Sequence, residues 1–195
     1  MNANGIYFNT YGPDPDVGAA VRSMTHTRLY FNRSANYYNL VGFMSEDSRG
    51  NRRLVYQTSD RYGVFTNFVP GATYSPYSSS GARNAVQAGM WQASGNYWHF
   101  DWWGPDGLNV GLDAYNYDAG TGPNGAHVGA EGWGGCPNAY PANYAWSWLY
   151  RSRANGSWYY MPAGRNATWG NTPTWSLFGS IANGGNISFG TTSCP

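Results

Sequence analysis

Apolar and polar side chains alternate with a period of two along most of the chain, and the 3.6-residue periodicity of helices is almost absent. Runs rich in Tyr, Trp, Val and Phe are bounded by Gly, Asn, Pro and Ser, which favour turns. This pattern predicts an all-β protein, namely an antiparallel β-sandwich or jelly roll, with a closed β-barrel as the alternative. No long polar linker interrupts residues 1–195, so a single domain is expected.

At most one or two short helices are expected. The first would run from Asp14 to Thr25, with Asp14 as the N-cap and Pro15 at the first helical position. A second short turn is expected around Ala82 to Ala88.

Three segments have the pattern of a β-hairpin: residues 28–40, 89–101 and 148–161. In each, two aromatic strands flank a turn that contains Asn with Ala, Ser or Gly. Their regular spacing allows a threefold internal repeat, but the segments between them align poorly. We therefore interpret them as a recurring hairpin pattern.

The third hairpin contains Asn155-Gly156, the strongest short signal for a two-residue type I′ loop. Such a loop pairs Arg153 with Trp158 and Arg151 with Tyr160. This face is expected to be exposed, with arginines over aromatic rings.

The central hairpin begins with "YWHFDWWGPDG", residues 97–107, and returns through "LNVGLDAYNYD". A five-residue loop, Gly104 to Leu108, keeps the apolar faces of both strands on one side. In this register Trp98, Phe100 and Trp102 face the core. The other face opposes His99 to Asp113 and leaves open space above Asp101, because Gly111 lies opposite it.

This second face is the candidate ligand-binding site. Polar groups and flanking rings can hold a sugar, because the polar groups bond its hydroxyls and a ring packs against its C–H face. A His–Asp pair with a second carboxylate is also suited to general acid–base chemistry. A solvent-facing His–Asp pair without function is the third interpretation. The proposed binding residues are Tyr97, His99, Asp101, Trp103, Asn109, Asp113 and Tyr115.

Charge and composition indicate which classes of binding partner the protein has. Only 11% of the residues are charged, against about 25% in an ordinary soluble domain, and the net charge is +1. No concentrated positive charge is present, which argues against nucleic acid and anionic membrane surfaces. No apolar run approaches the roughly 20 residues of a membrane span. With 17 Tyr and 10 Trp among abundant neutral polar residues, a neutral glycan is the expected partner, although tyrosines that only cover sheet faces would give the same composition.

An enzyme that cleaves glycans is the alternative function. Glycoside hydrolysis normally needs two carboxyl groups held about 5–10 Å apart. In size, low charge and richness in Tyr, Trp, Asn and Gly, the chain resembles the small β-jelly-roll xylanases, but the motifs of their catalytic strands do not surround Glu46 or Glu131. Glu131, among glycines and with Trp133 two residues further on, is the better candidate. The catalytic set of such an enzyme, a glycoside hydrolase or polysaccharide lyase, would be His99, Asp101, Asp113 and Glu131.

Other chemistries have weaker signals. Neither a GxSxG nor a GDSG motif for a nucleophilic serine occurs. The spacing His99-x-Asp101, with His127 further on, is a weak metal pattern. No cofactor is expected, and an irregular calcium site is the alternative that the sequence leaves. A toxin or coat protein that recognises a protein surface is a third class without a diagnostic feature.

Cys136 and Cys194 are expected to form a disulfide that holds the C-terminus, with two separate buried thiols as the alternative. Four Asn-x-Ser/Thr sequons also fit an extracellular protein. The sequence therefore predicts a secreted protein and leaves the oligomeric state open.

Overall fold

The computed structural model describes residues 3–12, 22–45, 52–133, 143–161, 176–179 and 187–190. Within these ranges the chain forms β-strands and no helix. The strands are β1 (Ala3–Gly12), β2 (Arg22–Asn32), β3 (Tyr37–Ser45), β4 (Arg52–Asp60), β5 (Gly63–Tyr74), β6 (Val86–Ser94), β7 (Tyr97–Trp103), β8 (Asn109–Tyr115), β9 (Gly125–Trp133), β10 (Asn143–Ser152), β11 (Trp158–Tyr160), β12 (Ser176–Gly179) and β13 (Ile187–Gly190).

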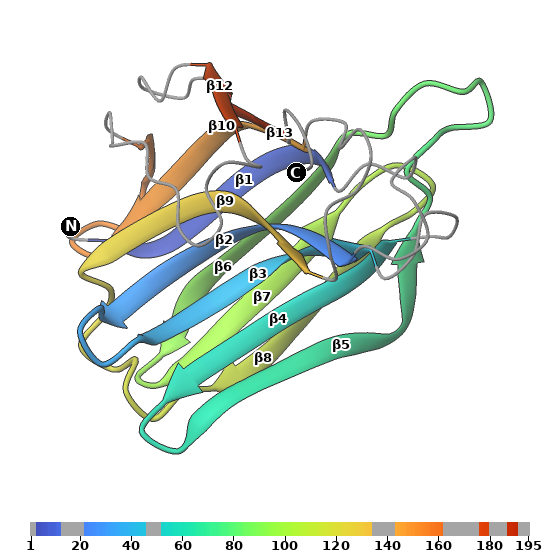
Figure 1. Ribbon diagram of the computed structural model, residues 1–195. Coiled ribbons are helices and arrows are strands. Elements are labelled where there is room, and N and C mark those ends of the chain that lie inside the picture. The colour runs from blue at the N-terminus through green and yellow to red at the C-terminus, as the bar shows by residue number, and fades with distance from the viewer. Residues whose placement is uncertain are drawn as a thin grey trace.

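The strands form two antiparallel sheets that pack face to face (Figure 1). One is eight-stranded, in the order β12-β13-β10-β1-β6-β7-β8, with β11 paired to β10. The other is five-stranded, in the order β5-β4-β3-β2-β9. Neither sheet closes on itself in the described part of the chain, so the predicted sandwich is confirmed and the barrel alternative is not adopted.

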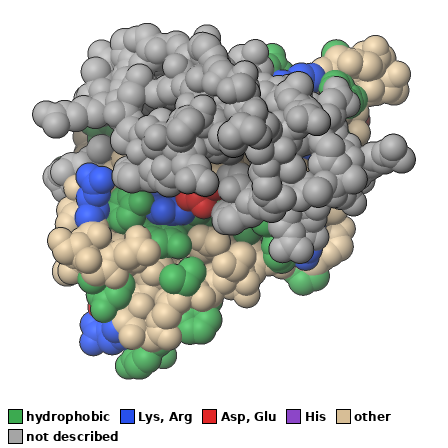
Figure 2. Space-filling model, viewed as in Figure 1, with side chains coloured by type: hydrophobic (Ala, Val, Ile, Leu, Met, Phe, Trp, Pro, Cys, Tyr) green, Lys and Arg blue, Asp and Glu red, His purple; other side chains and the backbone are tan. Residues whose placement is uncertain are grey.

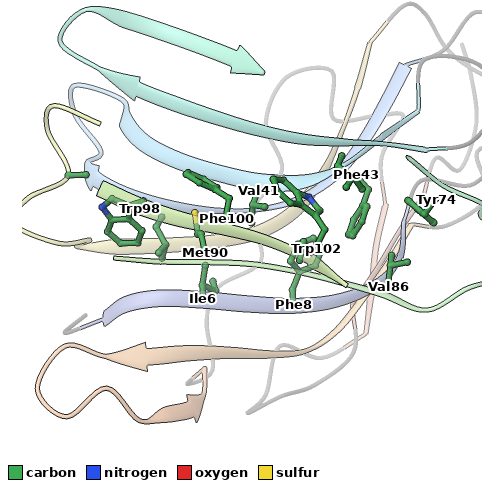
Figure 3. Close-up of a cluster of buried hydrophobic side chains, with 14 of the residues drawn as sticks. Ile6, Phe8, Val41, Phe43, Tyr74, Val86, Met90, Trp98, Phe100 and Trp102 are labelled. Carbon is green, nitrogen blue, oxygen red and sulfur yellow. The ribbon is translucent and has the colours of Figure 1, made fainter. Parts of the chain in front are cut away.

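The core lies between the two sheets and follows from the period-two alternation (Figure 3). Alternate residues of each strand point inward, so that side chains of β1, β6 and β7 meet those of β3 and β4. Trp98, Phe100 and Trp102 are fully buried, as predicted. Other members of this cluster are Ile6, Phe8, Val41, Phe43, Leu54 and Met90.

A hydrogen bond from Trp102 joins the two sheets through this core. The indole nitrogen of Trp102, on β7, donates to the backbone carbonyl of Gly42, on β3, at 2.9 Å. A Cβ on Gly42 would come within 2.3 Å of the Thr25 carbonyl oxygen, so only glycine fits there. Trp102 therefore supplies both packing and a polar link between the sheets.

The predicted register of the central hairpin is confirmed. Strands β7 and β8 are joined by the five residues 104–108. All seven predicted cross-strand pairs form, including His99 with Asp113 and Trp102 with Val110. The Gly104 amide donates to the Leu108 carbonyl at 3.0 Å and closes the loop.

The predicted register of the third hairpin is wrong. Trp158 pairs with Arg151, and not with Arg153. Gly156 has a positive φ, but Asn155 does not, so the type I′ turn cannot form. The Asn155 side chain instead accepts a hydrogen bond from the Ser157 amide at 2.9 Å, which stabilises a longer loop. An arginine does lie near an exposed ring, as expected, because the Arg151 guanidinium is 6.0 Å from the Trp158 ring centre.

The three hairpins occupy different places in the fold. Residues 28–40 lie in the five-stranded sheet, whereas residues 89–101 and 148–161 lie in the eight-stranded sheet. The predicted helix is wrong at its C-terminal end, because residues 22–25 belong to β2, and residues 14–21 lie outside the described ranges. Cys136 and Cys194 also lie outside them, so their disulfide stays a prediction. Among the described residues, no helix has the length and apolar character to cross a membrane.

Candidate functional site

The first candidate surface is the outer face of the eight-stranded sheet around His99. The two ring nitrogens of His99 contact two different carboxylates: Nδ1 lies 2.5 Å from Asp113 Oδ1, and Nε2 lies 2.6 Å from Asp101 Oδ1. The hydroxyl of Tyr7, from β1, donates to Asp101 Oδ2 at 2.8 Å. These four side chains form one continuous polar chain across β1, β7 and β8, which we call the His99 network.

Asp101 is placed differently from the sequence-based expectation. It is only 4% exposed. Burial raises the pKa of its carboxyl, and the hydrogen bonds from Tyr7 and His99 offset this only in part. Gly111 does not leave room for a ligand, because a Cβ there would lie 2.7 Å from Asp101 Oδ1 and 2.8 Å from His99 Nε2. The glycine makes room for the His–Asp contact itself, and a ligand can reach Asp113 more readily than Asp101.

Aromatic rings surround the His99 network. The Tyr7 ring centre lies 4.6 to 5.8 Å from those of Trp158, Trp103 and Trp91. Tyr97 and Tyr115, which oppose each other at the far end of the hairpin, are 52% and 41% exposed. All seven predicted binding residues therefore lie together on this face, with Asn109 opposite Trp103 at its edge.

The second candidate surface is the outer face of the five-stranded sheet. Glu131 of β9 accepts a hydrogen bond from Arg28 of β2, with Nη2 to Oε1 at 2.6 Å. The Nε2 atom of His26, also on β2, lies 3.5 Å from the same oxygen. The Glu131 side chain is 34% exposed and that of Arg28 is 14% exposed, so this ion pair is partly desolvated.

A line of polar contacts continues from Arg28 across the sheet. The Arg28 guanidinium donates to the Tyr30 hydroxyl at 3.2 Å and lies over the Tyr38 ring at 4.3 Å from its centre. The Tyr38 hydroxyl in turn donates to Gln57 Oε1 at 3.1 Å. We call the six residues His26, Arg28, Tyr30, Tyr38, Gln57 and Glu131 the polar band. In Figure 2, which views the molecule as in Figure 1, acidic and basic side chains meet beside the grey region.

Two histidines are held neutral: His26 within the polar band and His127 beside it. Burial, together with the charge of Arg28, lowers the pKa of His26 well below its usual value. The same causes lower the pKa of His127, on β9, to about 4. The two rings contact each other with centres 5.3 Å apart. The His127 ring lies over Gly129, where a Cβ would come within 2.6 Å of it.

These pKa shifts predict a loss of stability in acid. A histidine whose pKa is lowered by folding stabilises the protein above its unfolded pKa of about 6.5, and this contribution is lost as the pH falls towards the folded pKa. Between pH 7 and pH 5 the free energy of unfolding should fall, by at most about 1.4 kcal/mol per pH unit for each such histidine. Chemical denaturation at several pH values measures this. The variant His26→Gln should show a smaller fall, and an equal fall would contradict a neutral buried His26.

The proposed catalytic set is divided between the two surfaces. His99, Asp101 and Asp113 lie together on the eight-stranded sheet, whereas Glu131 lies on the five-stranded sheet. Arg28, Tyr38 and Gln57 were not predicted as site residues from the sequence. A signal was present, because the alternation of His26, Arg28 and Tyr30 along one strand places three polar side chains on one face. The described residues contain no group of three or more His, Cys, Asp or Glu that could hold a metal ion.

Comparison with known proteins supports the fold. No family model and no curated protein matches the sequence. Among solved structures, the chain is similar to scytalido-glutamic peptidase bound to a transition-state analogue inhibitor, with a TM-score of 0.65 and 10% identity. It is equally similar to SCP-B, a member of the Eqolisin family of peptidases, in complex with the tripeptide Ala-Ile-His, at 9% identity. Each comparison covers 98% of this chain and 94% of the other.

At these identities the likeness shows a shared fold, an antiparallel β-sandwich also used by peptidases. The similar structures are peptidases, so these comparisons give no support to a lectin or a glycoside hydrolase. Function must therefore be argued from the two surfaces themselves.

Proposed function

We propose that the protein is a hydrolase that cleaves peptide bonds, with Glu131 on the outer face of the five-stranded sheet as its catalytic residue. The observation that supports this most strongly is the environment of the Glu131 carboxylate. It is partly exposed, it contacts Arg28 at 2.6 Å, and it lies beside buried neutral imidazoles. A carboxylate, a cation and hydroxyl donors within one small area are the groups that acid–base hydrolysis requires.

The chemistry would proceed in two proton transfers. The Arg28 and His26 contacts both use Oε1 of Glu131, so Oε2 can accept a proton from a water molecule that attacks the substrate carbonyl carbon. The Arg28 guanidinium would stabilise the negative charge that forms on the carbonyl oxygen. Glu131 would then return the proton to the leaving amide nitrogen as the C–N bond breaks. One water is consumed, and one carboxyl and one amino terminus are formed.

The polar band would also hold the substrate in place. The contacts from Arg28 through Tyr38 to Gln57 cross three neighbouring strands, β2, β3 and β4. An extended peptide that lies across these strands would meet hydrogen-bonding side chains over several residues. The similar structures were solved with a transition-state analogue inhibitor of a peptidase or with a tripeptide, and peptide is on that basis the substrate class that we propose.

Incubation with a mixture of unstructured peptides, followed by mass spectrometry of the products, tests this function. We expect internal cleavage with incorporation of one water, at a rate that a peptide-based transition-state analogue reduces. Because the proposed steps use only Glu131, Arg28 and one water, a chelator should leave the rate unchanged. No cleavage between pH 3 and pH 8, or cleavage that Glu131→Gln leaves intact, would overturn the proposal.

Carbohydrate is the second candidate ligand, and the observation in its favour lies on the other sheet, in the exposed rings beside His99. A glycan-cleaving site there has less support, because Asp101 is buried and already bonded to Tyr7 and His99. Secretion of the protein stays a prediction from its sequence.

A further inference from the structure

We propose that the outer face of the eight-stranded sheet is a separate binding site for a neutral saccharide, with the exposed Tyr97–Tyr115 pair and Asp113 as its contact residues. This site is independent of hydrolysis at Glu131, which lies on the opposite sheet.

Aromatic rings pack closely against the strands of this face. The Tyr7 ring lies directly over Gly89 of the neighbouring strand, where a Cβ would come within 1.8 Å of the ring. The Trp158 ring likewise approaches Gly5 to 3.0 Å from the position of a Cβ. With Gly111 beneath His99, glycines on three strands of this face allow rings to lie close against the sheet. Rings held this close to the sheet, tilted by 32° to 58° against the Tyr7 ring, form an aromatic layer beside the Tyr97–Tyr115 pair, and an exposed ring packs well against the C–H face of a sugar.

Some aromatic rings of this face are exposed to a ligand. Tyr97 and Tyr115 pack edge to face, with centres 4.9 Å apart, and both are about half exposed. Trp158, at the far side of the same face, is 36% exposed. A row of aromatic rings from β11 to β8 would fit several sugar units better than a single one.

The polar groups beside the exposed tyrosines are mainly hydrogen-bond acceptors. The Asp113 side chain is 57% exposed, and its contact with His99 uses only Oδ1. Arg151 is on β10, which β1, β6 and β7 separate from the strand of Asp113, and its guanidinium lies beside Trp158 and donates to the carbonyl of Gly156 at 3.0 Å. A carboxylate without an adjacent free cation disfavours phosphate, sulfate and other anions, and it accepts hydrogen bonds well from sugar hydroxyls. The charge of the face therefore matches a neutral polyhydroxylated ligand.

Affinity electrophoresis tests this site, with soluble xylan, mixed-linkage β-glucan, galactomannan and chitin oligosaccharides as probes. We expect at least one of the four to retard the protein. Tyr97→Ala, Tyr115→Ala and Asp113→Asn should each weaken that interaction, by about tenfold for a stacked tyrosine. Phe65→Ala removes an equally exposed ring, 49%, from the five-stranded sheet and serves as the matched control with unchanged binding.

Glu131→Gln should bind the saccharide as the wild type does, which separates this site from the proposed hydrolytic one. Failure of all four probes to retard the protein would overturn the proposal. If the Tyr97→Ala and Tyr115→Ala variants bound the saccharide as strongly as the wild type, the proposal would also be overturned, since the ligand would then lie elsewhere. Retention by a cationic peptide such as oligolysine, and by none of the saccharides, would identify Asp113 as part of an acidic surface instead.

Discussion

Replacement of Glu131 by glutamine is expected to lower kcat/KM for peptide hydrolysis by about 10²–10⁴-fold, the usual contribution of a general base. Glutamine keeps the size and shape of the side chain but cannot accept the proton of the attacking water. Because Glu131 touches Arg28 at 2.6 Å, the amide oxygen can still accept from the guanidinium, so the local structure should persist. The measurement is steady-state hydrolysis of a peptide that the wild type cleaves, together with the thermal unfolding midpoint.

Two further variants locate the catalytic group. Asp113→Asn changes a carboxylate on the other sheet and should leave hydrolysis unchanged. His127→Gln tests the nearby imidazole, whose pKa of about 4 also makes it a neutral base at pH 7. If His127→Gln abolished hydrolysis while Glu131→Gln kept it, the imidazole and not the carboxylate would be the base, which contradicts our assignment.

Replacement of Trp102 by alanine is expected to lower the free energy of unfolding by about 3–5 kcal/mol, the range for large-to-small substitutions of buried aromatic residues. Trp102 is fully buried and its indole donates to the Gly42 carbonyl of the other sheet. Its removal leaves a cavity and also removes the indole hydrogen bond to the Gly42 carbonyl, which adds to the cost. Since small domains have only about 5–15 kcal/mol of total stability, this variant should unfold at a much lower urea concentration.

Trp103→Ala is the matched control, because Trp103 is the next residue of the same strand and points to the opposite face. It is only partly buried and contacts the Tyr7 ring at 5.1 Å. We expect it to cost less than half as much stability as Trp102→Ala. Equal losses for the two variants would contradict the division of this strand into a core face and an outer face.

Sequence alternation was sufficient to predict the sandwich and the central hairpin. Apolar and polar residues alternate from Trp98 to Trp102 and from Asn109 to Ala114, and only the five-residue loop keeps Phe100 opposite Leu112. The pairing register of β7 and β8 could be predicted, because a shift by one residue would have placed aspartates in the core. The contact between His99 and Asp113 could be predicted for the same reason, since it joins directly opposed residues.

Contacts between segments far apart in the sequence could not be predicted in this way. Tyr7 reaches Asp101 across 94 residues, and Arg28 reaches Glu131 across 103. Both depend on the order of strands in a sheet, which local alternation does not determine. The predicted register of the third hairpin was wrong for a local reason. The Asn155 side chain accepts a hydrogen bond from the Ser157 amide, and the Asn155 backbone does not adopt the positive φ of a type I′ turn.

A crystal structure of the protein with a peptide-based transition-state analogue tests the central claim most directly. The account predicts that the analogue lies across the outer face of the five-stranded sheet. Its tetrahedral centre should contact Glu131, with one oxygen within hydrogen-bond distance of Arg28. An analogue that lies on the His99 face, or on the five-stranded sheet away from Glu131, would contradict it.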